Sequence, residues 1–225
     1  MGETNQIHWR GQPAEVSIPD NKLMSLEQLA QPVDPSFNMS NIEEDTLVVI
    51  GVDAPLGFPS AFIKLLNGGR PAVMKPAKEI DNPLAYRFTD REMYRVFGKK
   101  ALSAAYDRIG NNATAAMLHT RLWQEEHEFK TYPFDDPWAE DNKIIIEVYP
   151  ALVKEKRFEE VHNYLREFFP SNTASGTDAY DACICAIYAI AFGMSGKVLP
   201  SLQGPPTDRK EEVKEEGWIY YFKPN

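Results

Sequence analysis

The sequence predicts a single α/β domain that spans residues 1–225. Two continuous apolar runs rich in β-branched residues, Thr46–Val52 and Lys143–Tyr149, are typical of strands buried on both faces. Segments with helical composition and periodicity lie between and after these runs, and such an alternation of strands and helices indicates α/β layers. A chain of 225 residues is long enough for one domain with one hydrophobic core.

The two long strands end at prolines, Pro55 and Pro150, which cannot donate a backbone hydrogen bond to a neighbouring strand. Shorter strands are expected at Ile7–Arg10, Ala14–Ile18 and Trp218–Phe222.

Helices are expected where apolar residues recur at helical spacing or where a capping pattern precedes them. Ser25–Gln28 and Thr89–Glu92 both have the form of a capping box. The expected helices cover residues 26–31, 61–66, 89–95 and beyond, 112–129, 158–169 and 177–192.

Composition and charge exclude several classes of protein. Apolar residues make up 43% of the chain and charged residues 25%, which excludes a disordered or collagen-like chain. The balance of 24 Lys and Arg against 33 Asp and Glu gives a net charge of −9. This charge argues against a surface that is cationic throughout and binds nucleic-acid phosphates, but it leaves room for a local basic groove.

The two cysteines and the hydropathy pattern favour a cytoplasmic protein with no membrane partner. Cys183 and Cys185 face different directions on a helix, so they form no disulfide framework, and a reducing compartment fits best. Met1–Trp9 is too polar for a secretory leader. The apolar run Ala182–Phe192 is shorter than the roughly 20 residues that a membrane-spanning helix needs.

Acidic residues interrupt the apolar segments at four positions: Asp53, Glu147, Asp178 and Asp181. The first two lie at or near the carboxyl ends of the buried strands, where α/β proteins form their functional crevices. Asp178 and Asp181 share one face of the following helix. A convergence of these hard oxygen ligands would suit Mg²⁺ or Mn²⁺, and two such ions would activate a water for phosphodiester hydrolysis.

Each carboxylate also has a purely structural explanation. Asp178 and Asp181 would complement the dipole at a helix start, and Asp53 would form an Asx turn. Glu147 would lie half-exposed on an edge strand or pair with an arginine such as Arg87.

Arg87 and Asp90, which flank Thr89, have two interpretations that the sequence leaves open. Arg87 would either form an ion pair with Asp90 at a capped helix start, or bind a substrate phosphate. No glycine-rich phosphate loop follows either long strand, which argues against nucleotide-dependent folds.

Five motifs in order resemble the DUF429 family, whose members are predicted nucleases of the ribonuclease H-like fold. The motifs are Val49–Gly57, Arg87–Asp90, Glu147–Pro150, Asp178–Ala182 and Glu216–Ile219. The resemblance extends from about Thr46 to the C-terminus, and Asp178–Ala182 is also similar to the closing motif of Holliday-junction resolvases. It implies a mixed β-sheet flanked by helices, with Asp53, Asp178 and Asp181 at metal-binding positions. Glu147 matches the E-V-Y-P motif of the family.

The chain departs from this fold at its beginning. The fold starts with a central strand that carries a metal-bridging aspartate, and no such segment precedes Ile7; Asp20 is an imperfect substitute. An empty position inside a sheet would leave backbone groups unpaired, so we expect it to be filled. The candidates are rearranged local strands, Trp218–Phe222, or a strand exchanged with a second copy in a homodimer.

Two functions follow as hypotheses. The first is a metal-dependent phosphodiesterase acting on nucleic acid, with Glu147 as a further ligand or general base. Its phosphate contacts would come from Lys75, Lys78, Arg87 and Arg91. The second is a catalytically degenerate ribonuclease H-like domain that serves binding or assembly. A small-molecule phosphohydrolase or a sugar-kinase-like relative is a third hypothesis, against which the absence of phosphate loops argues.

Overall fold

The computed structural model describes residues 6–19, 22–72, 76–136, 141–155, 158–171 and 173–223. The strands are β1 (Val48–Val52), β2 (Lys130–Tyr132), β3 (Lys143–Val148), β4 (Leu202–Gln203) and β5 (Ile219–Phe222). The α-helices are α1 (Leu26–Ala30), α2 (Ser60–Leu66), α3 (Phe88–Phe97), α4 (Gly110–His127), α5 (Glu159–Arg166), α6 (Asp178–Met194) and α7 (Lys210–Glu216). Short 3₁₀ turns are η1 (Met39–Asn41), η2 (Glu79–Asp81), η3 (Pro150–Leu152) and η5 (Thr207–Arg209).

The strands form one open, mixed sheet, as expected from the sequence. The order is β1-β3-β5-β4, and β2 also pairs with β3. β1, β2 and β5 run parallel to β3, and β4 runs antiparallel to β5. β2 pairs with Ile144–Ile146 and β5 with Glu147–Val148, so these two strands lie end to end along one edge of β3.

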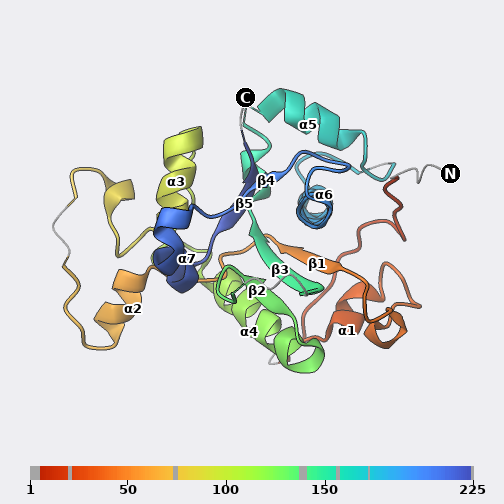
Figure 1. Cartoon of the computed structure of the whole chain (residues 1–225), viewed down its shortest axis with the longest axis horizontal. Coiled ribbons are helices and arrows are strands. Elements are labelled where there is room, and N and C mark those ends of the chain that lie inside the picture. The colour runs from red at the N-terminus through yellow and green to blue at the C-terminus, as the bar shows by residue number, and fades with distance from the viewer. Residues whose placement is uncertain are drawn as a thin grey trace.

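Helices cover both faces of the sheet (Figure 1). α6 lies over one face of β1 and β3, and α4 and α1 lie on the other face. Side chains of β3 alternate between the two resulting cores: Ile146 joins the core with α6, and Ile145 joins the core with Trp123 of α4. The α/β layer arrangement is therefore confirmed.

A glycine brings α6 into close contact with β1. A Cβ atom on Gly51 would lie 2.5 Å from the carbonyl oxygen of Cys185, and one on Gly193 would lie 3.0 Å from the Leu47 side chain. The absence of a side chain at Gly51 therefore allows the helix backbone to rest directly on the strand. This contact fixes the position of the N-terminal end of α6.

The two strands expected near the N-terminus, Ile7–Arg10 and Ala14–Ile18, are wrong. Residues 6–19 form neither helix nor strand. Trp9 instead donates a hydrogen bond from Nε1 to the carbonyl of Phe168 (2.6 Å), and its ring packs against the core beside α5. The apolar residues of this segment thus pack on the core without joining the sheet.

Among the residues that the structure describes, no strand fills the position beside β1, so rearranged local strands and Trp218–Phe222 are wrong as candidates, while a strand exchanged with a second copy stays a prediction. β1 pairs with β3 alone, and all its residues are only half-buried, which is typical of an edge strand. The Trp218–Phe222 segment does form a strand, β5, but it pairs with the opposite edge of β3. Asp20 lies outside the described residues.

Most expected helices are present, with shifted ends. α1 has the capping box of Ser25 and Gln28. α3 starts at Phe88, one residue before the expected start, because the carboxylate of Asp90 accepts the N–H of Arg87. The capping box expected at Thr89–Glu92 is therefore wrong, and the Thr89 hydroxyl accepts the N–H of Ile219 instead. β2 and β4 are too short to show a period in the sequence. α7 is strongly charged and buries few of its side chains, so the sequence does not reveal it as a helix.

The sequence predicts that no helix spans a membrane and that the two cysteines form no disulfide framework. None of the helices in the described ranges is both long and apolar enough to cross a membrane. Cys183 and Cys185 are buried free thiols.

Replacement of Gly51 by alanine tests the contact between α6 and β1. We expect Gly51→Ala to lower the free energy of unfolding by about 1–3 kcal/mol, because the added methyl group overlaps the backbone of α6. Urea unfolding followed by circular dichroism measures this change. Gly204→Ala is the control, since a Cβ there meets its nearest neighbour at 4.0 Å. Equal stabilities of the two variants would contradict the proposed contact.

Candidate functional site

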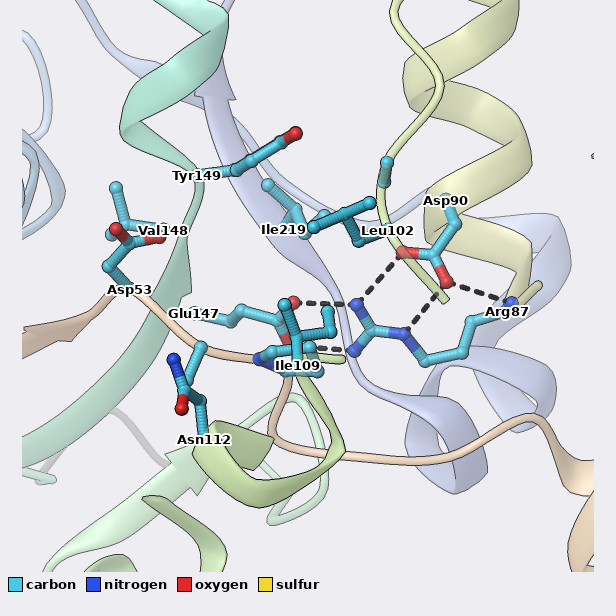
Figure 2. A pocket seen from close by; sticks show the side chains of 13 residues that line it. Asp53, Arg87, Asp90, Leu102, Ile109, Asn112, Glu147, Val148, Tyr149 and Ile219 are labelled. Atoms are coloured by element: carbon cyan, nitrogen blue, oxygen red, sulfur yellow. Dashed lines mark hydrogen bonds and ion pairs between the residues drawn. The ribbon is translucent and has the colours of Figure 1, made fainter. Parts of the chain in front are cut away.

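A cavity of about 170 Å³ lies at the carboxyl ends of β1 and β3 (Figure 2). Its polar lining comes from Asp53, Arg87, Asp90, Asn112, Glu147 and Tyr149. Its apolar lining comes from Ala101, Leu102, Ile109, Val148 and Ile219 among others. The location agrees with the expectation that function lies at the carboxyl ends of parallel strands.

The floor of the cavity is a buried ion-pair cluster centred on Arg87. Its guanidinium lies between two carboxylates, as Figure 2 shows. Nη2 and Nη1 donate to the two oxygens of Glu147, each at 2.7 Å. Nη2 and Nε donate to the two oxygens of Asp90 at 2.9 and 3.1 Å. Nη1 also donates to the carbonyl of Glu216 at 3.4 Å, so all five guanidinium N–H groups have acceptors.

This cluster answers the question that the sequence left open about Arg87. Burial alone would lower the pKa of Arg87, but Asp90 and Glu147 hold this pKa well above its usual value. Because each donor already has a partner, no guanidinium N–H is left for a phosphate. Arg87 and Asp90 therefore act structurally in this conformation, and phosphate binding by Arg87 would require the cluster to open.

Glu147 belongs to the same cluster and not to a free ligand set. One of its oxygens accepts from the backbone N–H of Leu56 (3.0 Å) in addition to Arg87. The alternative in which Glu147 pairs with Arg87 is the one that the structure shows. Both carboxylate oxygens have partners, so we do not assign Glu147 as a metal ligand.

Glu216 is a buried carboxylate that was not predicted as a site residue from the sequence. It accepts hydrogen bonds from the first turns of two helices. Its carboxylate accepts the N–H of Ser60 at the start of α2 (2.8 Å) and the N–H of Phe88 at the start of α3 (2.5 Å). The first N–H groups of a helix lack partners within the helix, so one buried carboxylate stabilises both ends. The only sequence signal is its place in the Glu216–Ile219 motif.

Glu147 lies between Asp53 and Arg87, so Asp53 is on the side of Glu147 that faces away from the arginine (Figure 2). Partial burial in the concave site raises the pKa of Asp53 to about 6, and repulsion from Asp181, Glu147 and Asp178 contributes to this shift. Lys154 opposes it. The Asp53 side chain is nevertheless exposed to solvent at the mouth of the cavity, and solvent screens part of this effect. A carboxylate with three acidic neighbours is a group whose charge a cation would relieve.

Asp181 projects from the first turn of α6 and pairs with Lys154, which was not among the residues predicted from the sequence. Lys154 Nζ donates a hydrogen bond to Oδ2 of Asp181 (2.9 Å). Nζ lies 2.6 Å from Oδ1, an ion-pair contact that lacks hydrogen-bond geometry, so this buried oxygen accepts no hydrogen bond. Asp178, in the same turn, is exposed.

The six predicted site residues thus form two adjacent groups. Arg87, Asp90 and Glu147 neutralise one another in the floor of the cavity. Asp53, Asp178 and Asp181 lie near one another where β1 ends and α6 begins, with Lys154 among them.

The aspartate group fits Mg²⁺ or Mn²⁺ in its chemistry. Its donors are carboxylate oxygens, which these ions prefer, and Oδ1 of Asp181 is a buried oxygen without a hydrogen bond. In the part of the chain that the structure describes, no three acidic, histidine or cysteine side chains form a preassembled metal-binding group. Metal binding would therefore require side chains to move. In particular, the Lys154 ammonium would have to leave Asp181.

Of the basic residues expected to meet phosphates, Arg87 lines the cavity, but Lys78 and Arg91 do not. Arg91 pairs with Glu212 (2.9 Å), and Lys78 precedes η2 as an exposed residue. Lys75 lies outside the described residues.

Arg87→Met tests the buried cluster against a matched exposed pair. We expect this change to lower the free energy of unfolding by about 3–5 kcal/mol, because two buried carboxylates lose the cation that pairs with them. The control, Arg91→Met, lies in the first turn of α3 and breaks a partly exposed pair, which is worth about 1 kcal/mol or less. Denaturant unfolding measures both, and similar losses in the two variants would refute the central role of Arg87.

The raised pKa of Asp53 predicts a pH dependence of stability. The folded-state pKa of about 6 exceeds the ordinary value of 3.8, so the folded protein holds the proton more tightly than the unfolded chain. The resulting stability is complete below about pH 4 and is lost as the pH rises through 6. We therefore expect Asp53→Asn to gain stability relative to wild type between pH 4 and 7.

Asp34 provides a control of opposite sign. Hydrogen bonds from the Ser36 hydroxyl and N–H lower the pKa of Asp34, so its contribution is lost as the pH falls. As the pH rises toward the ordinary aspartate pKa of 3.8, wild type gains this stability and the Asp34→Asn variant does not. We therefore expect Asp34→Asn to become less stable than wild type over this range. Thermal unfolding at several pH values measures both variants, and parallel pH profiles for them would contradict the shift at Asp53.

Comparisons of the chain with protein families, with curated proteins and with solved structures found no match. The resemblance of the five sequence motifs to the DUF429 family therefore stays a prediction. The structure adds a physical relation between the motifs: residues from Arg87–Asp90, Glu147–Pro150 and Glu216–Ile219 meet in the buried cluster.

Proposed function

We propose that the chain is a divalent-metal-dependent phosphodiesterase of ribonuclease H-like type that acts on nucleic acid. The observation that carries this proposal is the electrostatic repulsion of Asp53 by Asp181 and Asp178 at the end of β1, which adds to the effect of burial in raising the pKa of Asp53 to about 6. Three carboxylates in one place are electrostatically unfavourable unless a cation joins them. The motif resemblance supports the same three residues.

Each side chain has a stated role in this proposal. Asp53 and Asp181 hold Mg²⁺ or Mn²⁺, and Asp178 is the third ligand, directly or through water. A bound divalent ion lowers the pKa of a coordinated water and stabilises the leaving oxygen of a phosphodiester. The cluster of Arg87, Asp90 and Glu147 keeps the floor of the cavity rigid and so positions the end of β3.

The cavity limits which part of a nucleic acid can enter. With a volume of about 170 Å³ it admits a group no larger than a nucleotide fragment, and Leu102 and Ile109 belong to its apolar lining. The net charge of −9 disfavours extended contacts with a duplex backbone. Single-stranded or branched ends are therefore the favoured substrates.

The experiment is a hydrolysis assay with Mn²⁺ on single-stranded, duplex and branched substrates. We expect Asp53→Asn and Asp181→Asn each to reduce the metal-stimulated rate by about a hundredfold or more, because each loses a charged ligand. Asp208→Asn is the control, since its side chain is 80% exposed on η5 and lies 4.0 Å from Arg209, away from the aspartate group. Equal rates in wild type and both site variants would refute the proposal.

A degenerate domain that serves binding or assembly is the second candidate, and one observation favours it. Lys154 already supplies a cation to Asp181, and no preassembled metal group occurs in the described residues. Calorimetric titration with Mn²⁺ distinguishes the two candidates: a folded wild-type protein that takes up no metal would support the second. The free edge of β1 would then be the first surface to test for a homodimer.

A further inference from the structure

A second cavity, of about 340 Å³, lies where β2 and β5 follow each other along one edge of β3. Tyr132 pairs with Ile146 and Tyr220 pairs with Val148, so the two tyrosines stand two positions apart along β3. Their side chains therefore lie on the same face of the sheet. Phe192 of α6 contacts both tyrosine rings and forms one wall of the cavity.

The lining of this cavity is mostly apolar and rich in aromatic rings. The ring of Phe192 meets the ring of Tyr132 with centroids 6.1 Å apart and the ring of Tyr220 with centroids 5.1 Å apart, both edge-on. The remaining apolar lining comes from Pro133, Pro205, Pro206 and Val213. Aromatic rings attract one another in edge-to-face and offset contacts, so such a lining suits a ligand that carries an aromatic ring.

Tyr220 also brings a hydroxyl group without a protein partner to this cavity. The residue is 5% exposed, and burial raises the pKa of Tyr220. Its hydroxyl forms no hydrogen bond with any residue that the structure describes. Because the hydroxyl of a buried tyrosine normally has a hydrogen-bond partner, a ligand oxygen in the cavity would supply the one that is missing.

Two lysines on one face of α7 give one end of the cavity a positive charge. Lys210 and Lys214 are four residues apart, and their ammonium groups lie 3.3 and 2.6 Å from Oδ1 of Asp136. The Asp136 side chain is 54% exposed, so the ammonium groups lie at the end that opens to solvent. Among the described residues that line the cavity, these lysines alone are charged, and they share a single carboxylate.

We propose that this cavity binds a small aromatic carboxylic acid. Its ring packs among Tyr132, Phe192 and Tyr220, and its carboxylate lies at the two lysines, where it competes with the carboxylate of Asp136. The hydroxyl of Tyr220 donates to an oxygen of the acid. The inference does not depend on the proposed phosphodiesterase activity, because the two cavities have no lining residue in common.

Calorimetric titration of the full chain with 3-phenylpropanoate tests this proposal. We expect a dissociation constant of about 1 mM or below, as the small size of the ligand allows. 3-Phenylpropanamide has the same shape without the charge, so it should bind about fivefold more weakly, because it forms no ion pair with the lysines.

Two variants of opposite sign isolate the contribution of the charges. Lys214→Met should weaken the binding of 3-phenylpropanoate about fivefold, because one ion pair is lost. Asp136→Asn should tighten this binding about threefold, because the carboxylate that competes for the lysines is gone. Neither variant should change the affinity for the amide. Tyr220→Phe keeps the ring and should weaken the binding of the acid about threefold through the lost hydrogen bond.

Lys100→Met is the matched control. Lys100 is also partly exposed and pairs with a carboxylate, Glu79 at 2.9 Å, but it does not line the cavity. Its removal changes the net charge by the same amount as Lys214→Met. We expect the affinity of this variant for 3-phenylpropanoate to stay within about twofold of wild type, since distant charges are screened. Circular dichroism establishes that each variant is folded, and Lys214→Gln serves if Lys214→Met is not.

The outcomes decide between a carboxylate site and an unselective apolar hollow. Weaker binding by Lys214→Met and tighter binding by Asp136→Asn, with Lys100→Met unchanged, support the proposal. Absence of binding by wild type at millimolar 3-phenylpropanoate overturns it. So do equal affinities for the acid and the amide, or equal effects of Lys214→Met and Lys100→Met. None of these outcomes bears on the hydrolysis assay.

Discussion

The pairing of one buried arginine with two buried carboxylates is the constraint on which the rest of the site depends. Arg87 joins the start of α3, the end of β3 and the turn before β5. Isolated charges are very costly inside a protein, so the three segments must meet in the one arrangement that satisfies all five N–H groups. The N–H of Leu56 on Glu147 and the Glu216 carboxylate on the starts of α2 and α3 extend this arrangement. The floor of the cavity is rigid for that reason.

The aspartates next to this floor are held in a different way. Gly51 allows α6 to rest on β1, and this contact brings the first turn of α6, with Asp178 and Asp181, to the end of β1 where Asp53 lies. Their charges have no buried arginine between them, only the half-exposed Lys154. The polar floor is therefore fixed by a buried arginine, whereas the neighbouring aspartates are paired with a half-exposed lysine.

The sheet is open on the side of β1. Among the described residues no strand lies beyond it, whereas β3 is paired along both edges. In the fold that the sequence motifs resemble, this neighbouring position holds a strand with a further aspartate. The proposed site therefore draws its three acids from two places in the fold, the end of β1 and the first turn of α6.

The sequence by itself determined the elements whose signal is local. The apolar runs of β1 and β3, the capping box of α1 and the small residues of α6 depend on neighbours within a few positions, and these elements form as expected. Only the tertiary structure decided which acids pair with which cations, because partners such as Arg87 and Glu147 lie 60 residues apart and their choice depends on packing. The same holds for the edge position of β1 and for Lys154: strand pairing and ion pairing are long-range contacts that no periodicity in the sequence encodes.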